Sequence, residues 1–300
     1  MSYIDTIKSL PQVMTPGSSA CQGCGGELIT RRVMQLAGSN SVFAVPPGCM
    51  AGAGVDGWSY QNGCTAPIHI TLLDNTASFM SGVSEMYQRR GRGDVNIVAI
   101  AGDGATADCG FQSLSGAAER GAKMLYVCYD NEGYMNTGFQ RSSTTSLGSR
   151  TSTTPTGSAI NGKEQNAKYV PLILAMHNIE YCATASPSHM MDFVGKIKRG
   201  LECSKRGFAY IHVFSPCPTG WGFAPDESIA VARRAVRSNM FPLWECERGR
   251  FMLSDSNRSP ITIAEFVEGI GKFSRLNEAE LAELQRAADA RWELVKKLCG

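Results

Sequence analysis

Residues 96–138 read NIVAIAGDGATADCGFQSLSGAAERGAKMLYVCYDNEGYMNTG, the most informative stretch of the chain for its architecture. Two short apolar runs, at residues 96–101 and 124–129, flank a helical pattern at residues 111–120. A buried strand, a helix and a second buried strand predict two parallel strands joined by a crossover helix. Ligands of such sheets bind beyond the carboxyl ends of the strands. The residues that follow the two apolar runs are therefore the first candidates for a site.

The same alternation continues on both sides of this stretch. Further strands are expected at residues 41–46, 69–73, 180–184 and 208–214, and further helices at residues 27–36, 77–90, 164–177 and 188–204. We predict an α/β fold, an open and mostly parallel sheet with helices on both faces. Residues 1–245 form this domain, and residues 246–300 form a helical extension that packs on the domain or on a partner subunit. Its main helix is expected at residues 277–298.

The polar segment SSTTSLGSRTSTTPTGS, residues 142–158, interrupts the pattern. One interpretation is a flexible linker, because the segment has little to bury. The other is an active-site or interface loop. Its position directly after residues 96–138 favours the loop.

Composition excludes several classes of function. The 300 residues carry a net charge of +2 and are 43% apolar and 19% charged. This balance gives no electrostatic reason to expect nucleic acid or an anionic membrane as a partner. The first residues lack the pattern of a secretory signal, and no apolar run approaches the roughly 18 residues of a membrane span. We expect a soluble, cytoplasmic protein.

Polar side chains follow both apolar runs of the first motif. Asp103 lies in a Gly-Asp-Gly turn after one strand, and Asn131 follows 28 residues later, after the next strand. A carboxylate, an amide oxygen and a nearby backbone carbonyl suit Mg²⁺, whose remaining positions can be filled by diphosphate oxygens and water. The glycines allow close approach of phosphates. A simple tight turn is the alternative, but the strand before the turn and the spacing to Asn131 favour the metal.

Eleven cysteines are a high and odd number. In a long chain without a secretory signal we expect reduced thiols, some of which bind metal, rather than a framework of disulfides. Cys21 and Cys24 form a C-x₂-C pair, which is compatible with a redox-active dithiol, a zinc site or a [4Fe–4S] cluster. Cys49, in PPGCM, and Cys217, in SPCPTGW, each follow a predicted strand and are the candidates for two further ligands. The other cysteines are interpreted either as core residues (Cys109, Cys128, Cys182) or as free thiols without a task (Cys64, Cys203, Cys246, Cys299).

Together, CQGCGG, PPGCM, GDGATADCGFQSLSGAAERG, YDNEGYMNTGFQRSS and SPCPTGW resemble β subunits of 2-oxoacid:ferredoxin oxidoreductases, the thiamine-diphosphate-binding subunits, especially of the pyruvate type. The resemblance runs from about Cys21 to Trp221. It implies one set of ligands for a [4Fe–4S] cluster (Cys21, Cys24, Cys49, Cys217) and one for Mg²⁺ (Asp103, Asn131 and the carbonyl of Gly133). It implies contacts to thiamine diphosphate from Cys49, Gly102, Asp103, Gly104, Ala105, Asn131, Gly133, Tyr134, Asn136 and Thr137, with Asn136 and Asn75 as catalytic candidates.

The resemblance also implies a reaction and partners. A 2-oxoacid, pyruvate first, is oxidatively decarboxylated on thiamine diphosphate, electrons pass through the cluster to ferredoxin or a similar acceptor, and coenzyme A usually takes the acyl group. The α, γ and δ subunits, or fused equivalents, carry the activating glutamate and further clusters; for Glu27 and Glu132 surface or capping roles are expected. PPGCM and Gly26 depart from the pyruvate pattern, which leaves 2-oxoisovalerate, phenylglyoxylate and oxalate as alternative substrates.

Two other functions remain open on the sequence. A thiamine-diphosphate decarboxylase or synthase without redox chemistry explains the Gly-Asp-Gly turn but gives the four cysteines no task. A zinc-stabilised interaction scaffold explains the cysteines and makes that turn a coincidence. Iron and acid-labile sulfide distinguish the first from the oxidoreductase, and stoichiometric zinc without thiamine diphosphate indicates the second.

Overall fold

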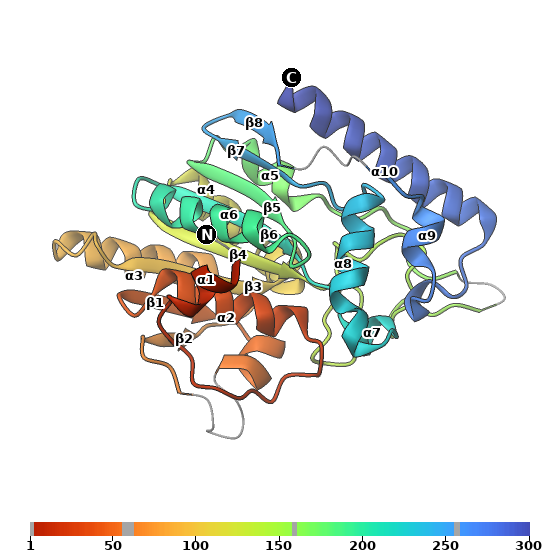
Figure 1. Cartoon of the computed structure of the whole chain (residues 1–300). Coiled ribbons are helices and arrows are strands. Elements are labelled where there is room, and N and C mark those ends of the chain that lie inside the picture. The colour runs from red at the N-terminus through yellow and green to blue at the C-terminus, as the bar shows by residue number, and fades with distance from the viewer. Residues whose placement is uncertain (1–2, 56–62, 158–160, 255–258) are drawn as a thin grey trace.

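The computed structural model describes residues 3–55, 63–157, 161–254 and 259–300, and their centre is one eight-stranded sheet (Figure 1). The strands are β1 (Ser41–Val45), β2 (Ile68–Ile70), β3 (Asn96–Gly102), β4 (Met124–Asp130), β5 (Tyr181–Ala185), β6 (Phe208–Phe214), β7 (Trp244–Glu247) and β8 (Arg250–Leu253). Their order is β2-β1-β3-β4-β6-β5-β7-β8, with β1 to β6 parallel and β7 and β8 added antiparallel at one edge. The predicted α/β class is confirmed.

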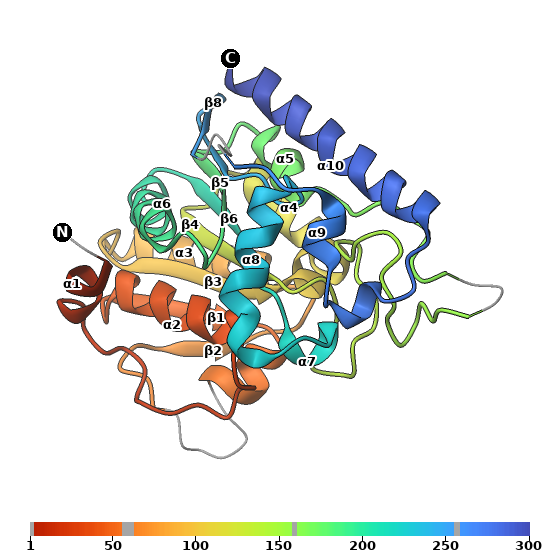
Figure 2. The ribbon, with the colours of Figure 1, turned by 45° about the vertical axis from the view of Figure 1, so that its right-hand side comes forward.

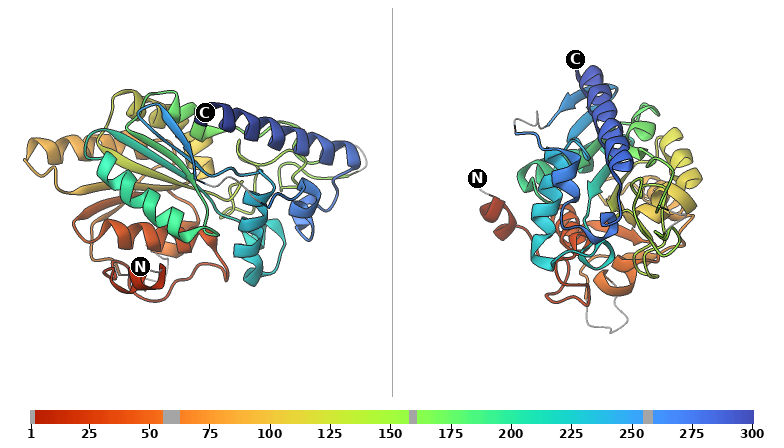
Figure 3. Two further views of the ribbon diagram at one scale, coloured as in Figure 1. Left: turned by 45° about the horizontal axis from the view of Figure 1, so that its top comes forward. Right: turned by 90° about the vertical axis from the view of Figure 1, so that its right-hand side faces the viewer.

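Helices cover both faces of the sheet. The helices are α1 (Tyr3–Lys8), α2 (Gly25–Ala37), α3 (Thr76–Arg89), α4 (Phe111–Glu119), α5 (Val170–Ala175), α6 (Met190–Cys203), α7 (Pro218–Trp221), α8 (Ser228–Arg237), α9 (Ile263–Val267) and α10 (Glu278–Cys299). Two π-helical segments, η1 (Met50–Val55) and η2 (Gly104–Cys109), and two 3₁₀ turns, η3 (Pro225–Glu227) and η4 (Gly271–Phe273), complete the described elements. The left view of Figure 3 shows α2 and α6 on the opposite side of the sheet from α10.

The central strands are buried on both sides, which explains their continuous apolar sequence. In β3, Val98 and Ile100 point into the core beneath α2 and α6, whereas Ile97 and Ala99 belong to the core beneath α3, α4 and α5. Every residue of β4 and β6 is buried. The six strands predicted from apolar runs are therefore the six parallel strands of the sheet.

The main differences from prediction lie where packing outweighs local pattern. The helix expected at residues 164–177 is only α5, because the chain before Val170 is irregular. The β7–β8 hairpin was not predicted; its strands have four residues each, β7 is buried only at alternate positions, and no residue of β8 is buried. The hairpin spans the boundary expected after residue 245. The division of the chain into a domain and a C-terminal extension stays a prediction.

The C-terminal elements form a third core beside the carboxyl ends of the strands. Figure 2 shows α8, α9 and α10 together on one side of the molecule, with α7 below α8. Their buried side chains include Trp221, Val231, Phe266 and Leu284. Capping boxes, Thr262 with Glu265 and Asn277 with Glu280, fix the beginnings of α9 and α10. Within the described ranges, no helix has the length and apolar character needed to cross a membrane.

The strand order places a crevice at a defined point. The chain moves from β1 outwards to β2 and then returns to lay β3 on the other side of β1. In open α/β sheets, ligands bind at such a reversal, outside the carboxyl ends of the strands. The segments that follow β1, β3 and β4 all meet there.

Candidate active site

Three oxygen atoms from two neighbouring strand ends meet at the carboxyl edge of the sheet. Gly102 pairs with Tyr129 in the β3–β4 register, so Asp103 and Asn131 leave the sheet side by side. The side-chain oxygen of Asn131 lies 2.9 Å from the carbonyl oxygen of Gly133 and 3.0 Å from Asp103 Oδ1. No hydrogen stands between these atoms in this amide orientation; the opposite orientation would donate hydrogen bonds to both.

This spacing fits a small divalent cation. Mg²⁺ holds its ligands at about 2.0–2.1 Å in an octahedron, so adjacent ligand oxygens lie about 2.9 Å apart. The carboxylate of Asp103, the amide of Asn131 and the carbonyl of Gly133 are hard oxygen donors at that separation. These three residues therefore fit the Mg²⁺ ion that the sequence pattern predicts.

Charge at this point also favours a cation. Asp103 is fully buried, and burial together with the nearby Asp130 carboxylate raises the pKa of Asp103 well above its usual value. The hydroxyl of Thr144 stands between the two carboxylates, 3.0 Å from Asp103 Oδ2 and 2.8 Å from Asp130 Oδ1. Burial opposes ionisation of Asp130, but its hydrogen bond to His212, 2.8 Å long, and the charge of that ring lower its pKa.

A cavity of about 130 Å³ lies directly over the three oxygens. All nine predicted cofactor contacts other than Asp103 line it: Cys49, Gly102, Gly104, Ala105, Asn131, Gly133, Tyr134, Asn136 and Thr137. Glycine is required at two of these positions. A Cβ on Gly104 would lie 2.5 Å from the Tyr134 ring, and one on Gly133 would lie 2.9 Å from the Gln140 carbonyl oxygen. The backbone itself forms this surface.

Asn75, one of the two predicted catalytic residues, lies outside both cavities. It precedes α3, and its Oδ1 accepts a hydrogen bond from the backbone N–H of Leu72 at 3.0 Å. Neither cavity wall includes it. This contact gives Asn75 a local role in the turn before α3, whereas Asn136 lines both cavities.

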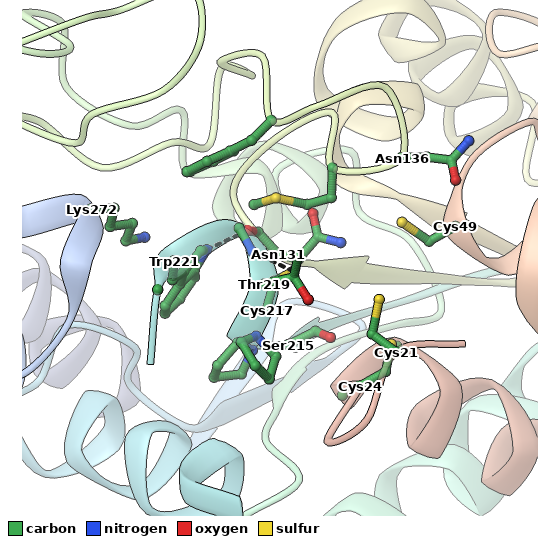
Figure 4. Close-up of a pocket in the computed structure, with 18 of the residues that line it drawn as sticks. Cys21, Cys24, Cys49, Asn131, Asn136, Ser215, Cys217, Thr219, Trp221 and Lys272 are labelled. Carbon is green, nitrogen blue, oxygen red and sulfur yellow. Dashed lines mark hydrogen bonds between the residues drawn. The ribbon is translucent and has the colours of Figure 1, made fainter. Parts of the chain in front are cut away.

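The four predicted cluster cysteines line one larger cavity of about 740 Å³ (Figure 4). Cys21 and Cys24 come from the loop before α2, Cys49 follows β1, and Cys217 follows β6. Among the described residues, no three His, Cys, Asp or Glu side chains are close enough to hold a single metal ion. In a [4Fe–4S] cluster each cysteine binds a different iron, so its four sulfurs need not reach one ion.

The cavity is suited to sulfur ligands that bind metal. Backbone N–H groups point at two of the sulfurs, from Glu27 to Cys24 at 3.5 Å and from Gly220 to Cys217 at 3.3 Å. Burial, followed by the proximity of Cys217, raises the pKa of Cys49 to about 12. Burial also raises the pKa of Cys217 to about 11. These thiols are therefore protonated without metal, and metal binding displaces their protons.

One wall separates the two cavities. Tyr129, Cys49, Asn131, Met135 and Asn136 line both of them. Tyr129 is buried, and a Cβ on Gly102 or on Gly48 would lie 3.3 Å or 3.5 Å from its hydroxyl. A single layer of side chains thus stands between the three-oxygen site and the cysteines.

Glu132 does not have the surface or capping role expected from the sequence. Its carboxylate is buried and lies 2.6 Å from the Nζ of Lys272, which is also buried. Lys272 comes from η4, in the C-terminal extension, and no local sequence signal connects it with Glu132. Glu27 remains at the first turn of α2, where it pairs with Arg31 at 2.7 Å.

Burial corrects one expectation about the cysteines. Cys109 is exposed rather than part of the core, whereas Cys128 and Cys182 are buried as predicted.

The polar segment from residue 142 is not a flexible linker in its described part, which extends to residue 157. Ser142, Thr144 and Ser146 are buried and hydrogen-bond to Asp103, Asp130 and Glu132. The segment is a lid of hydroxyl groups over the strand ends.

Comparison with known proteins agrees with this geometry. The family model for the C-terminal, thiamine-pyrophosphate-binding domain of thiamine pyrophosphate enzymes matches residues 56–213, more than half of the chain. The matched stretch includes Asp103, Asn131 and Gly133 but not Lys272.

Relatives of named function align over almost the whole chain. It is 40% identical to pyruvate synthase subunit PorB of Methanothermobacter marburgensis, over 93% of this chain and 96% of that one. It is 38% identical to ketoisovalerate oxidoreductase subunit VorB of Pyrococcus furiosus, over 94% of this chain and 92% of that one. It is 42% identical to the β subunit of NADH-dependent phenylglyoxylate dehydrogenase of Aromatoleum evansii, over 95% of this chain but only 64% of that longer relative.

A solved structure shares the fold. The 2-oxoglutarate:ferredoxin oxidoreductase of Magnetococcus marinus superposes with a TM-score of 0.54 over 98% of this chain and 91% of that one. The sequences are 20% identical, so this likeness concerns the fold alone.

Proposed function

The chain belongs to the β subunits of the 2-oxoacid:ferredoxin oxidoreductase family, and from this premise we propose that it binds thiamine diphosphate through Mg²⁺ and carries a [4Fe–4S] cluster. The reaction is the oxidative decarboxylation of a 2-oxoacid, with coenzyme A as the usual acyl acceptor and ferredoxin or a similar protein as electron acceptor. The observation that carries the proposal is the arrangement of three oxygen ligands and four cysteines on either side of one wall.

Asp103, Asn131 and the Gly133 carbonyl would hold the metal, and the backbone around Gly104 would lie against the diphosphate. When bound, thiamine diphosphate supplies the electron sink for loss of CO₂. The chain's own residues bind and orient it. The three oxygens set the position of the metal, the Gly104 and Gly133 backbones leave space for the phosphates, and the lid hydroxyls hold the Asp103 carboxylate in place.

Cys21, Cys24, Cys49 and Cys217 would bind the four irons. The N–H groups directed at Cys24 and Cys217 stabilise negative charge on their sulfurs and tune the cluster's potential. Tyr129 and Cys49 belong to the wall that the two cavities share. This shared wall supports direct electron transfer between the two sites.

Partner subunits are part of the proposal. The relatives are named as subunits, which makes this chain one component of a larger enzyme. Among the described residues, no glutamate lines either cavity. Glu132 is paired with Lys272, and Glu27 with Arg31. We expect that glutamate, and the further clusters, on other subunits.

Pyruvate is the first substrate to test, and phenylglyoxylate the second. Two pyruvate synthase subunits at 39–40% identity and nearly full coverage support the first, and the 42% identity to a phenylglyoxylate dehydrogenase subunit supports the second. 2-Oxoisovalerate and oxalate follow.

The test is to purify the native complex without oxygen and to measure dye reduction with each 2-oxoacid, with and without coenzyme A. Iron, acid-labile sulfide and thiamine diphosphate are determined on the same sample. Substrate-dependent reduction, together with all three components, is the expected result. Thiamine diphosphate without iron or sulfide would identify a decarboxylase or synthase instead, and zinc without thiamine diphosphate a scaffold.

A further inference from the structure

A buried ion pair links the C-terminal extension to the turn that carries two of the three oxygen ligands. Lys272 is fully buried, its Nζ lies 2.6 Å from Glu132 Oε2, and Glu132 stands between Asn131 and Gly133 in the chain. Backbone φ at Glu132 is +60°, a left-handed conformation that is unfavourable for a side chain with a Cβ. Surrounding contacts must therefore hold the turn in this shape.

Lys272 is the centre of those contacts. Its ammonium lies 3.3 Å from the centroid of the Trp221 ring, and Trp221 Nε1 donates a hydrogen bond of 2.8 Å to the carbonyl oxygen of Asn131. Lys272 thus reaches the ligand turn by two routes, through the Glu132 carboxylate and through the Trp221 ring. Both lead to the backbone between Asn131 and Gly133.

The lid completes the arrangement from the other side. Ser146 donates to the Glu132 carboxylate through its N–H at 3.0 Å and its hydroxyl at 2.6 Å, and Thr145 Oγ1 donates to the Glu132 carbonyl at 2.7 Å. The N–H of Arg150, at the end of this part of the lid, donates to the Lys272 carbonyl at 2.9 Å. Lid, extension and ligand turn form one connected unit.

We propose that Lys272 is a positioning residue, which fixes the Asn131–Gly133 turn so that its oxygens can bind Mg²⁺ and the diphosphate. The proposal deepens the proposed function and rests on it. It also gives the C-terminal extension a task at the site, although Lys272 lies outside the stretch matched by the family model. Residues that orient metal ligands typically change metal affinity by roughly ten- to a hundredfold when replaced.

The test is a Mg²⁺ titration of thiamine diphosphate retention by the purified complex, with bound cofactor measured chemically after removal of free cofactor. Lys272→Met should raise the Mg²⁺ concentration for half-maximal retention by roughly ten- to a hundredfold. The matched control is Lys196→Met. Lys196 is also buried, 2.8 Å from Asp192 and from the Thr184 carbonyl, but it lines neither cavity. Its loss should lower the melting temperature and leave the Mg²⁺ midpoint unchanged.

Lys272→Met leaves the Glu132 carboxylate buried without its partner, which destabilises the fold. The double variant Lys272→Met/Glu132→Gln removes both charges and keeps the shapes. A double variant that melts near the parent temperature but needs more Mg²⁺ supports positioning. One that melts near the parent temperature with the parental Mg²⁺ midpoint overturns it. If the parent complex itself retains no thiamine diphosphate, the proposed function fails, a result distinct from the failure of the positioning role.

Discussion

Asn131 shows how much one side chain can reveal about a site. Its side-chain amide lies 3.0 Å from Asp103 Oδ1 and 2.9 Å from the Gly133 carbonyl oxygen, so that with its oxygen directed at them the three oxygens can surround one cation. The sequence indicated Asp103 and Asn131 because each follows a buried strand, and parallel pairing brings such positions together. The contribution of Gly133 came only from the family resemblance, since a backbone carbonyl leaves no mark in a sequence.

Asp103→Asn should separate metal binding from folding. The replacement keeps the shape but removes a charge from the three-oxygen site, so the affinity for thiamine diphosphate in the presence of Mg²⁺ should fall at least about a hundredfold. The cofactor-free protein should melt at the parental temperature or above, because one of two adjacent buried carboxylates is neutralised. Calorimetric titration measures the affinity for thiamine diphosphate, and thermal melting measures the stability of the cofactor-free protein. Unchanged cofactor affinity would contradict the metal assignment.

Cys217→Ser should remove the cluster and spare the cofactor. Iron and sulfide per chain should fall by about half or more, because one of four ligands is lost. Thiamine diphosphate retention should stay close to the parental value, since Cys217 does not line the smaller cavity. Cys109→Ser is the control, an exposed cysteine that lines neither cavity. Equal iron content in all three proteins would place the cluster elsewhere.

Glu132 and Lys272 mark the limit of prediction for single residues. They are 140 positions apart, and each taken alone is an ordinary surface residue type. Only the third core, which folds η4 back onto the sheet edge, brings them together. The prediction of a core position for Cys109 is wrong because Cys109 is the exposed last residue of η2, whereas residues 104–107 of that segment are buried.

The lid, the described part of the polar segment from residue 142, shows why polarity alone does not predict disorder. Its hydroxyl groups are buried because the strand ends offer buried carboxylates as acceptors. Elements with an apolar pattern were predictable: the six parallel strands and α10 lie where the periodicity indicates them. For the lid, the position of the segment after the main motif correctly favoured a loop at the site, but its polar contacts were not predictable. The irregular chain before α5 was not predicted either.

Lys163 hydrogen-bonds to the lid, and its titration should make the free energy of unfolding depend on pH. Its Nζ donates to the Thr145 carbonyl at 2.7 Å, and burial lowers its pKa to about 8. In the unfolded chain the lysine pKa is about 10.4, so between about pH 8 and pH 10 the unfolded chain binds more protons at this residue than the folded chain. The contribution of Lys163 to the free energy of unfolding therefore increases as the pH rises through this range. The difference in unfolding free energy between the parent and Lys163→Met should therefore grow with pH, by up to about 1.4 kcal/mol per unit. Urea denaturation at several pH values measures it. A constant difference would show that Lys163 keeps its usual pKa.

For the whole molecule, the C-terminal extension is a structural part of the domain rather than an appendage. α10 contributes Leu284, Ala288 and Val295 to two of the three cores. The sequence predicted the helix and its apolar face but left two partners open, the domain itself or another subunit. The structure shows that α10 packs on the domain, with its closest strand contact at β8.

Leu284→Ala should therefore destabilise the entire fold. Leu284 is 3% exposed in the third core, and truncation of such a side chain costs about 2–5 kcal/mol. Leu294→Ala, on the same helix but 47% exposed, should change the unfolding free energy by less than about 0.5 kcal/mol. Denaturant titration compares the two. Similar small effects would mean that α10 can detach while the sheet stays folded.

Two of the cysteines that line the larger cavity differ in their exposure to solvent. Cys49 is part of the wall that the two cavities share, whereas Cys21 is exposed. If the four cysteines bind a cluster, Cys49 would hold its iron on the side of the smaller cavity, and Cys21 would hold the iron that is open to solvent and to an electron-accepting partner. Dioxygen approaches from solvent, so damage by air should begin at the Cys21 iron while the buried side of the site is still intact.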